Sequence, residues 1–278
     1  MNRFVFAFLP ALLTSCTPDS DPANTDDVVA QNPYGATFEC PALVDGENVI
    51  TVNGLDRDLH LALPANPEGA PVVFAWHWLG GDADQIMSWM GVRGMTATGA
   101  IVVAPESTHL PAEWDLLVGP DTSIDVALFD QLLGCLWEQH HVDADRVFST
   151  GMSAGGLFTS YLTQYRSEVL AASAPFSGGI NASFYSSPTT TLPVMLSWGG
   201  ETDQYGQYDF NAATQWFSQS LRDEGHFVVE CNHGLGHLPP PDATAMAWTF
   251  FAAHPRGVSP EPWASALPSA LPSYCAIP

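Results

Sequence analysis

The sequence predicts an α/β fold in which a mainly parallel sheet carries helices on both faces. Strand-like apolar runs recur along the 278 residues and alternate with helical stretches. Several of these runs contain a continuous apolar stretch, which is typical of strands that are buried on both faces. No internal repeat and no domain boundary interrupts the alternation, so we expect one domain of this class.

The first expected strands form a hairpin. Segment 47–64, ENVITVNGLDRDLHLALP, has two strand-like halves around Asn53-Gly54, a pair that favours a tight hairpin turn. Further strands are expected within the apolar runs 70–78, 99–107, 145–150, 170–179, 192–200 and 226–231.

Helices are expected between these strands. The clearest is 123–141, because its large apolar residues share one helical face: Leu128, Phe129, Leu132, Leu133, Leu136 and Trp137. Other helices are expected at 84–98, 155–169, 210–224 and 242–253, the last capped by Asp242.

The first residues predict export. Residues 1–16 combine one arginine, an apolar run at 4–13, small residues and Cys16, which is the pattern of a secretory signal peptide. The run is too short for a stable transmembrane helix. Leu13-Thr14-Ser15-Cys16 also resembles a bacterial lipobox, in which Cys16 would carry a lipid, and ordinary cleavage nearby is the alternative. Membrane contact is therefore expected only through a lipid anchor, with the protein at the cell envelope, or otherwise periplasmic or secreted.

A tether and one domain are expected after the signal peptide. Residues 17–36 are polar and flexible in composition, and 37–278 form the domain, with a proline-rich tail after His254. The remaining cysteines are Cys40, Cys135, Cys231 and Cys275. An even number in an exported chain predicts two disulfides, with three pairings open, and Cys275 could hold the tail on the domain.

The charge excludes some partners. The net charge is −23 and the chain contains no lysine, so its surface repels phosphate backbones and disfavours strongly anionic substrates. We therefore expect no nucleic-acid partner. No Cys-x-x-Cys spacing or convincing histidine spacing indicates a metal site, and no cofactor is implied.

The turn GMSAGG, after the run 145–150, presents a candidate nucleophile, Ser153. A serine hydroxyl needs a base to take its proton and an acid to orient that base. Asp203 and His237 each follow a later strand-like run, so all three side chains are expected at the carboxyl edge of one sheet. Glu201 and Asp209 are the alternatives for the acid.

His233 is the alternative to His237 as the base. The other histidines, His140 and His141 included, are expected at the surface or at helix ends. The backbone N–H of Ala154 and of Leu79 are the expected donors of an oxyanion hole. Trp78 and Trp198 lie at strand ends beside this region, where either could contact an acyl group or simply pack in the core.

Four segments together resemble the polyhydroxybutyrate depolymerase and feruloyl esterase group of α/β-hydrolases: RVFSTGMSAGG, FAWHWLGG, GGETD and GLGH. The resemblance covers roughly residues 45–254. It implies an α/β-hydrolase fold and cleavage of a carboxylic ester, of the feruloyl, acetyl, short-chain or hydroxyalkanoate type. The ester would be a small molecule or part of a polymer.

The sequence departs from that group at one loop. The usual His-Gly is replaced by His77-Trp78, which suggests an aromatic wall beside the pocket. No polymer-binding domain follows, so attack on crystalline polyester is less expected. The favoured prediction is an exported serine esterase. A serine peptidase of the same fold and a non-catalytic lipoprotein that binds a glycan or a protein partner are the alternatives.

Overall fold

The computed structural model describes Met1 and residues 32–34, 39–108 and 112–278. The predicted signal peptide, the lipobox cysteine Cys16 and most of the tether lie outside the described residues. Asn32–Pro278 belong to one structural unit. Within the described ranges, no helix is both long enough and apolar enough to cross a bilayer.

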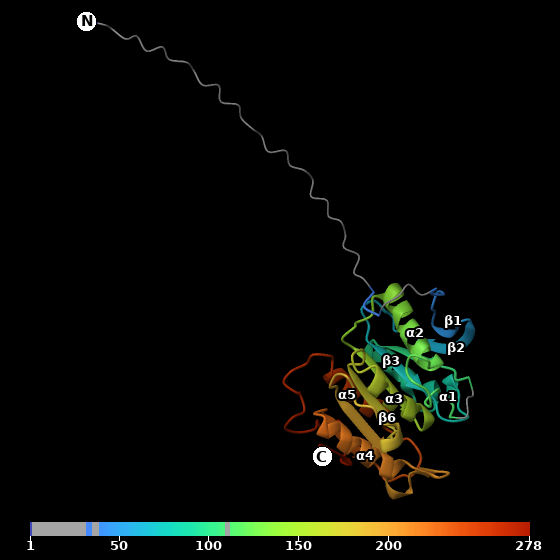
Figure 1. The fold of residues 1–278 in the computed structure, drawn as a ribbon, viewed down its shortest axis with the longest axis vertical. Helices are drawn as coiled ribbons and strands as arrows, with labels where there is room; N and C mark the ends of the chain where they lie inside the picture. The colour runs from blue at the N-terminus through green and yellow to red at the C-terminus, as the bar shows by residue number, and fades with distance from the viewer. Residues whose placement is uncertain (2–31, 35–38, 109–111) are drawn as a thin grey trace. The chain divides into compact units, whose positions relative to one another are not determined.

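A nine-stranded sheet runs through this unit, in the order β1-β2-β4-β3-β5-β6-β7-β10-β11 (Figure 1). Its strands are β1 (Gly46–Val52), β2 (Leu55–Ala62), β3 (Val72–Trp76), β4 (Ile101–Pro105), β5 (Val147–Met152), β6 (Ala172–Phe176), β7 (Val194–Trp198), β10 (Val228–Asn232) and β11 (Cys275–Ala276). A separate hairpin joins β8 (Gln204–Tyr205) to β9 (Tyr208–Asp209).

The centre of the sheet is parallel, as predicted. The strands from β4 to β10 pair in parallel, while β1, β2 and β11 are antiparallel additions at the two edges. The predicted hairpin is present, and Asn53 and Gly54 both have positive φ, 52° and 80°, which a tight two-residue turn requires. The fold class predicted from the sequence is confirmed, and the parallel strands direct their carboxyl ends to one edge.

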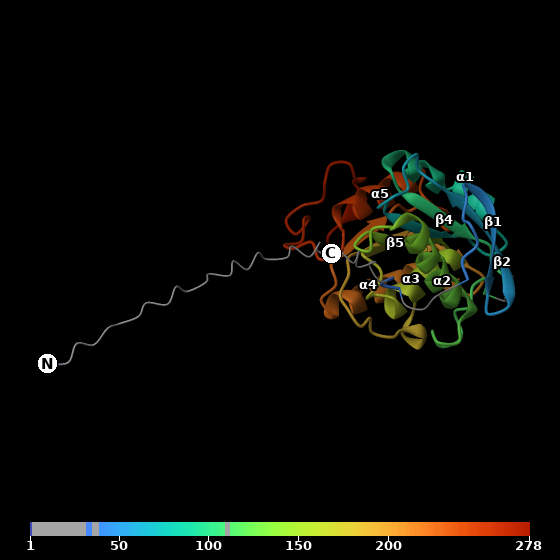
Figure 2. The same cartoon turned by 90° about the horizontal axis from the view of Figure 1, so that it is seen from above.

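Helices cover both faces of the sheet (Figure 2). One face carries α2 (Ile124–His140), α3 (Ala154–Tyr165) and α4 (Phe210–Asp223), and the other carries α1 (Ala83–Ser88) and α5 (Ala243–Ala253). Each layer buries its own apolar cluster against the sheet. The apolar face predicted for α2 is buried, apart from Trp137, which is half-buried.

Three helix details differ from the prediction. The stretch 84–98 is not one helix, because Gly91 has a φ of 77° and separates α1 from a 3₁₀ helix at Val92–Thr98. The helix predicted at 155–169 ends at Tyr165. Asp242 precedes α5, but its side chain does not cap the helix and instead accepts a hydrogen bond from the Tyr274 hydroxyl at 2.6 Å.

The four cysteines of the domain form two disulfides, Cys40–Cys135 and Cys231–Cys275. This confirms the predicted number and selects one of the three pairings. Cys275 lies opposite Cys231 in the pairing of β11 with β10. The proline-rich tail is therefore attached to the sheet by a disulfide and by strand pairing.

Candidate active site

Ser153 occupies a sharp turn between β5 and α3. Its backbone has φ 57° and ψ −118°, a conformation that non-glycine residues rarely adopt. Such a turn lifts the side chain out of the strand and places it at the start of the helix, above the carboxyl edge of the sheet.

The glycines beside Ser153 allow the helix to approach the neighbouring strand closely. A Cβ at Gly155 would lie 1.9 Å from the Trp76 carbonyl oxygen, and one at Gly151 would lie 2.7 Å from the same oxygen. Any larger residue would push β3 and α3 apart. The glycine-rich corner is therefore a packing requirement of the turn that carries Ser153.

A continuous hydrogen-bonded chain joins three of the predicted residues. Ser153 Oγ lies 2.8 Å from His237 Nε2, and His237 Nδ1 lies 2.7 Å from Asp203 Oδ1. Because an ionised carboxylate only accepts, Nδ1 carries the proton and Nε2 accepts from the serine hydroxyl. Ser153, Asp203 and His237 follow β5, β7 and β10, whose carboxyl ends meet at one edge of the sheet.

Asp203 is fully buried and is held by three donors. Besides His237, the Ser177 hydroxyl donates to Asp203 Oδ2 at 2.7 Å and the Gly199 N–H donates to it at 2.8 Å. Ser177, directly after β6, has a φ of 43°, which is also unusual for a non-glycine residue. Ser177 was not among the predicted site residues, although its position near the end of the run 170–179, at the same edge of the sheet, indicates it.

A close backbone contact supports the loop that carries His237. A Cβ at Gly199 would lie 1.8 Å from the Gly236 carbonyl oxygen, and the Gly236 N–H donates to the Gly199 carbonyl at 3.0 Å. The acid loop and the histidine loop are therefore joined directly through their backbones. The His237 ring also stacks on Phe210, with ring centroids 4.5 Å apart.

The two alternative acids lie outside this hydrogen-bonded chain. Glu201 is exposed, and Asp209 caps α4 by accepting from the Ala212 N–H at 2.9 Å. The alternative base, His233, accepts from the Leu235 N–H at 3.2 Å. Burial lowers the pKa of His233, an effect opposed by the nearby carboxylates of Asp203 and Asp242.

The remaining histidines named in the sequence analysis lie at the end of α2. Burial lowers the pKa of His140, and His141 pairs with Glu68 at 3.0 Å. Among the residues that the structure describes, no three His, Cys, Asp or Glu side chains gather as a metal ion would require.

The loop after β3 presents the second predicted oxyanion donor. The Trp78 carbonyl accepts from the Gly81 N–H at 2.8 Å and contacts His77 Nδ1 at 2.9 Å. In the trans peptide between Trp78 and Leu79, the carbonyl and the N–H point in opposite directions. The Leu79 N–H therefore points away from the Gly81 N–H and from His77 Nδ1. Leu79 itself lines the cavity at Ser153. Ala154 is the first residue of α3, where an N–H has no acceptor within the helix.

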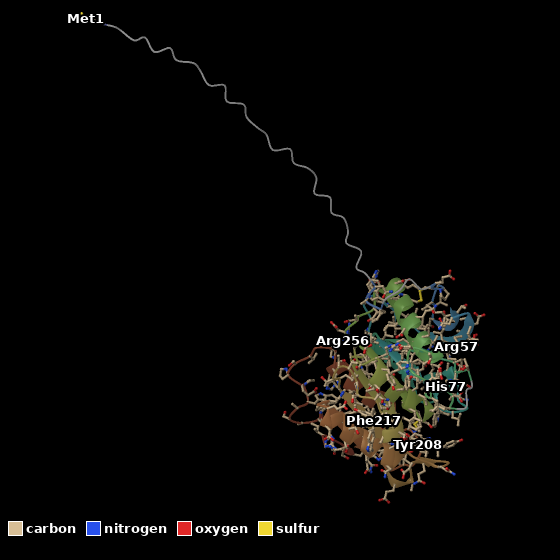
Figure 3. The ribbon with its side chains drawn as sticks, viewed as in Figure 1. Met1, Arg57, His77, Tyr208, Phe217 and Arg256 are labelled. Atoms are coloured by element: carbon tan, nitrogen blue, oxygen red, sulfur yellow. A yellow bond between two sulfur atoms is a disulfide. The ribbon has the colours of Figure 1, made fainter. Side chains whose placement is uncertain are left out.

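A buried polar network that the sequence analysis missed holds this loop. His77 is fully buried and its Nε2 accepts from the Ser107 N–H at 3.2 Å (His77 is labelled in Figure 3). Glu113, also buried, accepts from the Gly80 N–H at 3.0 Å and from the Ser107 hydroxyl at 2.5 Å. These contacts fix the backbone on both sides of Leu79.

A cavity of about 190 Å³ opens at Ser153 and His237. Trp78 and Trp89 form part of its wall and meet edge to face, with ring centroids 4.8 Å apart. Trp198 does not line the cavity: it is buried and its indole N–H donates to Asn211 at 2.8 Å. Of these two tryptophans, Trp78 lines the cavity at Ser153 and Trp198 packs in the core.

Comparisons with known proteins agree with this fold. The solved structure of native sOPH superposes with a TM-score of 0.71 at 20% identity, over 87% of this chain and 96% of that one. A ferulic acid esterase structure gives a TM-score of 0.57 at 16% identity, over 74% of this chain and 95% of that one. The chain therefore has the α/β-hydrolase fold.

Sequence relatives are esterases by name, although no protein-family model matches the chain. A probable feruloyl esterase C of Aspergillus oryzae is 29% identical in an alignment of 254 positions that covers 77% of this chain and 88% of the relative. A bifunctional acetylxylan esterase/xylanase of Neocallimastix patriciarum is 24% identical over 70% of this chain. The chain spans only 28% of that second relative's length. The resemblance predicted from the sequence is confirmed, since the chain has the α/β-hydrolase fold and its relatives are named as esterases.

Proposed function

We propose that this protein hydrolyses carboxylic esters with Ser153 as the nucleophile, His237 as the general base and acid, and Asp203 as the residue that orients and stabilises the histidine. The observation that carries the proposal is the chain of hydrogen bonds of 2.8 Å and 2.7 Å that joins these three side chains. That geometry is what nucleophilic activation of a serine requires.

In the first half of the reaction, Ser153 Oγ attacks the ester carbonyl while His237 Nε2 takes its proton. Asp203 keeps the proton on Nδ1 and stabilises the positive charge that develops on the ring. The N–H groups of Ala154 and Leu79 would then donate to the negatively charged oxygen of the tetrahedral intermediate. His237 next gives its proton to the departing alcohol, and an acyl group remains on Ser153.

The second half returns the enzyme to its starting state. A water molecule takes the place of the alcohol, loses a proton to His237 Nε2 and attacks the acyl carbon. Collapse of this second intermediate releases the carboxylic acid and returns the proton to Ser153 Oγ. The proposed chemistry uses only side chains and backbone groups of this chain together with water.

The test combines covalent labelling with turnover. A fluorophosphonate probe is expected to label the wild-type protein, and p-nitrophenyl acetate is expected to be cleaved. Ser153→Ala should lose both properties while keeping its thermal unfolding temperature. His233→Ala, a nearby histidine outside the hydrogen-bonded chain, is the matched control and should keep both. Labelling or near-wild-type turnover in Ser153→Ala would disprove the assignment.

Two comparisons address the alternatives. An unlabelled, inactive wild-type protein would favour the non-catalytic lipoprotein. Faster turnover of a peptide p-nitroanilide than of the matching ester would favour the peptidase.

We also infer action outside the cytoplasm, since two disulfides are typical of exported proteins. The lipid on Cys16 stays a prediction, which mass spectrometry of the mature N-terminus would test.

A further inference from the structure

A second cavity of about 190 Å³ lies beside α3. Its lining is mostly apolar and includes Leu116, Leu117, Leu157, Ile180, Phe184 and Tyr208. These residues come from α3, from the loop after β6, from β9 and from the loop before α2. Tyr208, labelled in Figure 3, lies at the end of the molecule near α4.

The two cavities adjoin the same two segments of the chain. Along α3, Ser153 lines the first cavity, and Leu157, whose N–H donates to the Ser153 carbonyl at 2.8 Å, lines the second. In the β8–β9 hairpin, Tyr205 lines the first cavity and its cross-strand partner Tyr208 lines the second. Ser153 and the β8–β9 hairpin therefore lie between the two cavities.

Two aromatic ring contacts connect the second cavity to the base. The Phe210 ring lies 4.7 Å from the Tyr208 ring and 4.5 Å from the His237 ring, centroid to centroid. A group held against Tyr208 is thus one ring away from the histidine that transfers protons in the proposed reaction.

The polar atoms of the second cavity already have partners. The hydroxyl of Tyr208 donates to the Gly179 carbonyl at 2.9 Å, and that of Tyr161 donates to the Val118 carbonyl at 2.6 Å. The Gln164 amide donates to the Ser160 carbonyl at 3.1 Å and accepts from the Ser186 N–H at 2.6 Å. A sugar placed here would leave hydroxyl groups without partners, at a cost of about 1–3 kcal/mol for each buried group.

Exposed apolar side chains surround both openings. Of the fifteen exposed large apolar residues in the described part of the chain, six line these two cavities: Leu79, Trp89, Leu117, Phe184, Tyr205 and Leu238. Exposed apolar surface gathered in this way is typical of a binding surface. None of the arginines in the described ranges lines either cavity, so no cation is present to pair with an anionic ligand.

We infer that the substrate is a neutral ester with an apolar group on each side of the ester bond, and that each cavity holds one of the two groups. This inference rests on the proposed esterase function and names its substrate class. A cavity of about 150 Å³ can hold a benzene ring, so each space here fits one ring or a short branched chain. Acetylated sugars, which carry many hydroxyl groups, fit this site poorly.

The test uses two series of esters and a pH-stat readout of released acid. One series varies the acid at constant alcohol: ethyl acetate, ethyl butyrate and ethyl benzoate. The other varies the alcohol at constant acid: ethyl, butyl and benzyl acetate. Phe184→Gln alters the second cavity and Trp89→Gln alters the first, and both residues are exposed, so folding should be unaffected. Val49→Gln, at an equally exposed apolar residue on β1, is the matched control.

The wild-type kcat/KM should rise along both series. Each cavity variant should lose about tenfold or more on the larger members of one series only, and the two variants should affect different series. The control should match the wild type. Three outcomes would each overturn the inference. The first is an equal effect of both variants on one series, and the second is no effect of Phe184→Gln. The third is a preference for acetylated xylo-oligosaccharide over benzyl acetate. Wild-type turnover of ethyl acetate and fluorophosphonate labelling report on the proposed esterase function separately.

Discussion

Replacing Ser177 by alanine tests whether the buried acid needs all of its donors. The Ser177 hydroxyl donates to Asp203 Oδ2 at 2.7 Å, on the carboxylate oxygen that does not face His237. The substitution removes this donor and leaves only the Gly199 N–H, at 2.8 Å, to hold that oxygen. The carboxylate is then less firmly oriented toward the histidine.

The size of the effect follows from the charge on the acceptor. A hydrogen bond to a charged group contributes about 1.5–3 kcal/mol. If the transition state loses the whole of this stabilisation, kcat falls roughly 10- to 150-fold, since each 1.36 kcal/mol is a factor of ten in rate. KM should stay within about twofold, because Ser177 does not line the cavity at Ser153.

Steady-state kinetics on p-nitrophenyl butyrate would measure the two constants. Ser197→Ala is the matched control: Ser197 is also buried at the end of a neighbouring strand, and its hydroxyl has no partner among the described residues. The control should keep the wild-type kcat. An unchanged kcat in Ser177→Ala would refute the positioning role. So would a loss of kcat/KM that comes entirely from a higher KM.

Three further results are expected. The double variant Ser153→Ala/His237→Ala should be no less active than either single variant, because residues that act as a unit do not contribute additively; a much larger loss in the double variant would contradict this. Asp125→Ala should lower the free energy of unfolding by about 3–5 kcal/mol in urea titrations, because it leaves Arg57 buried, with 2% of its side chain exposed, without its carboxylate at 2.7 Å. Trp78→Gly should raise kcat/KM for bulky aromatic esters relative to acetyl esters, and should cost less stability than the roughly 3–5 kcal/mol typical of a fully buried tryptophan; an unchanged ester preference would remove Trp78 from the site.

The sheet could be predicted because its strands are buried on both faces. Continuous apolar runs such as Val72–Trp76 and Ile101–Pro105 have no competing helical pattern of comparable length, and every residue in both is buried. Helix ends were less predictable, since they depend on single residues. Helix α1 ends at Ser88, and Gly91, with a positive φ that its neighbours in the sequence do not indicate, separates it from the following 3₁₀ helix.

The three hydrogen-bonded side chains of the candidate site could be predicted from their positions, but the residues that support them could not. Ser153, Asp203 and His237 each follow a strand, and parallel strands bring such positions to one edge. Ser177 and Glu113 are single polar residues in segments without periodicity. Their roles depend on which loops meet in three dimensions, and that information is absent from local sequence.

Backbone strain identifies these supporting residues independently of their hydrogen bonds. Five non-glycine residues of the described chain have positive φ: Asn53, Glu113, His141, Ser153 and Ser177. Asn53 belongs to the β1–β2 turn and His141 ends α2, where such a conformation is common.

The other three residues lie at the site, and each has a different task. Ser153, with φ 57°, carries the proposed nucleophile, Ser177, with φ 43°, holds the acid, and Glu113, with φ 67°, holds the loop of the proposed oxyanion donor. Each such conformation costs about 1–3 kcal/mol and persists only where the surroundings enforce it. At this site the surroundings are the close glycine contacts of Gly151 and Gly155 and the buried hydrogen bonds of Asp203 and Glu113. The fold therefore holds the proposed nucleophile, its proposed acid and the proposed oxyanion loop in strained but fixed positions before any substrate arrives, which is the preorganisation that ester hydrolysis by a serine requires.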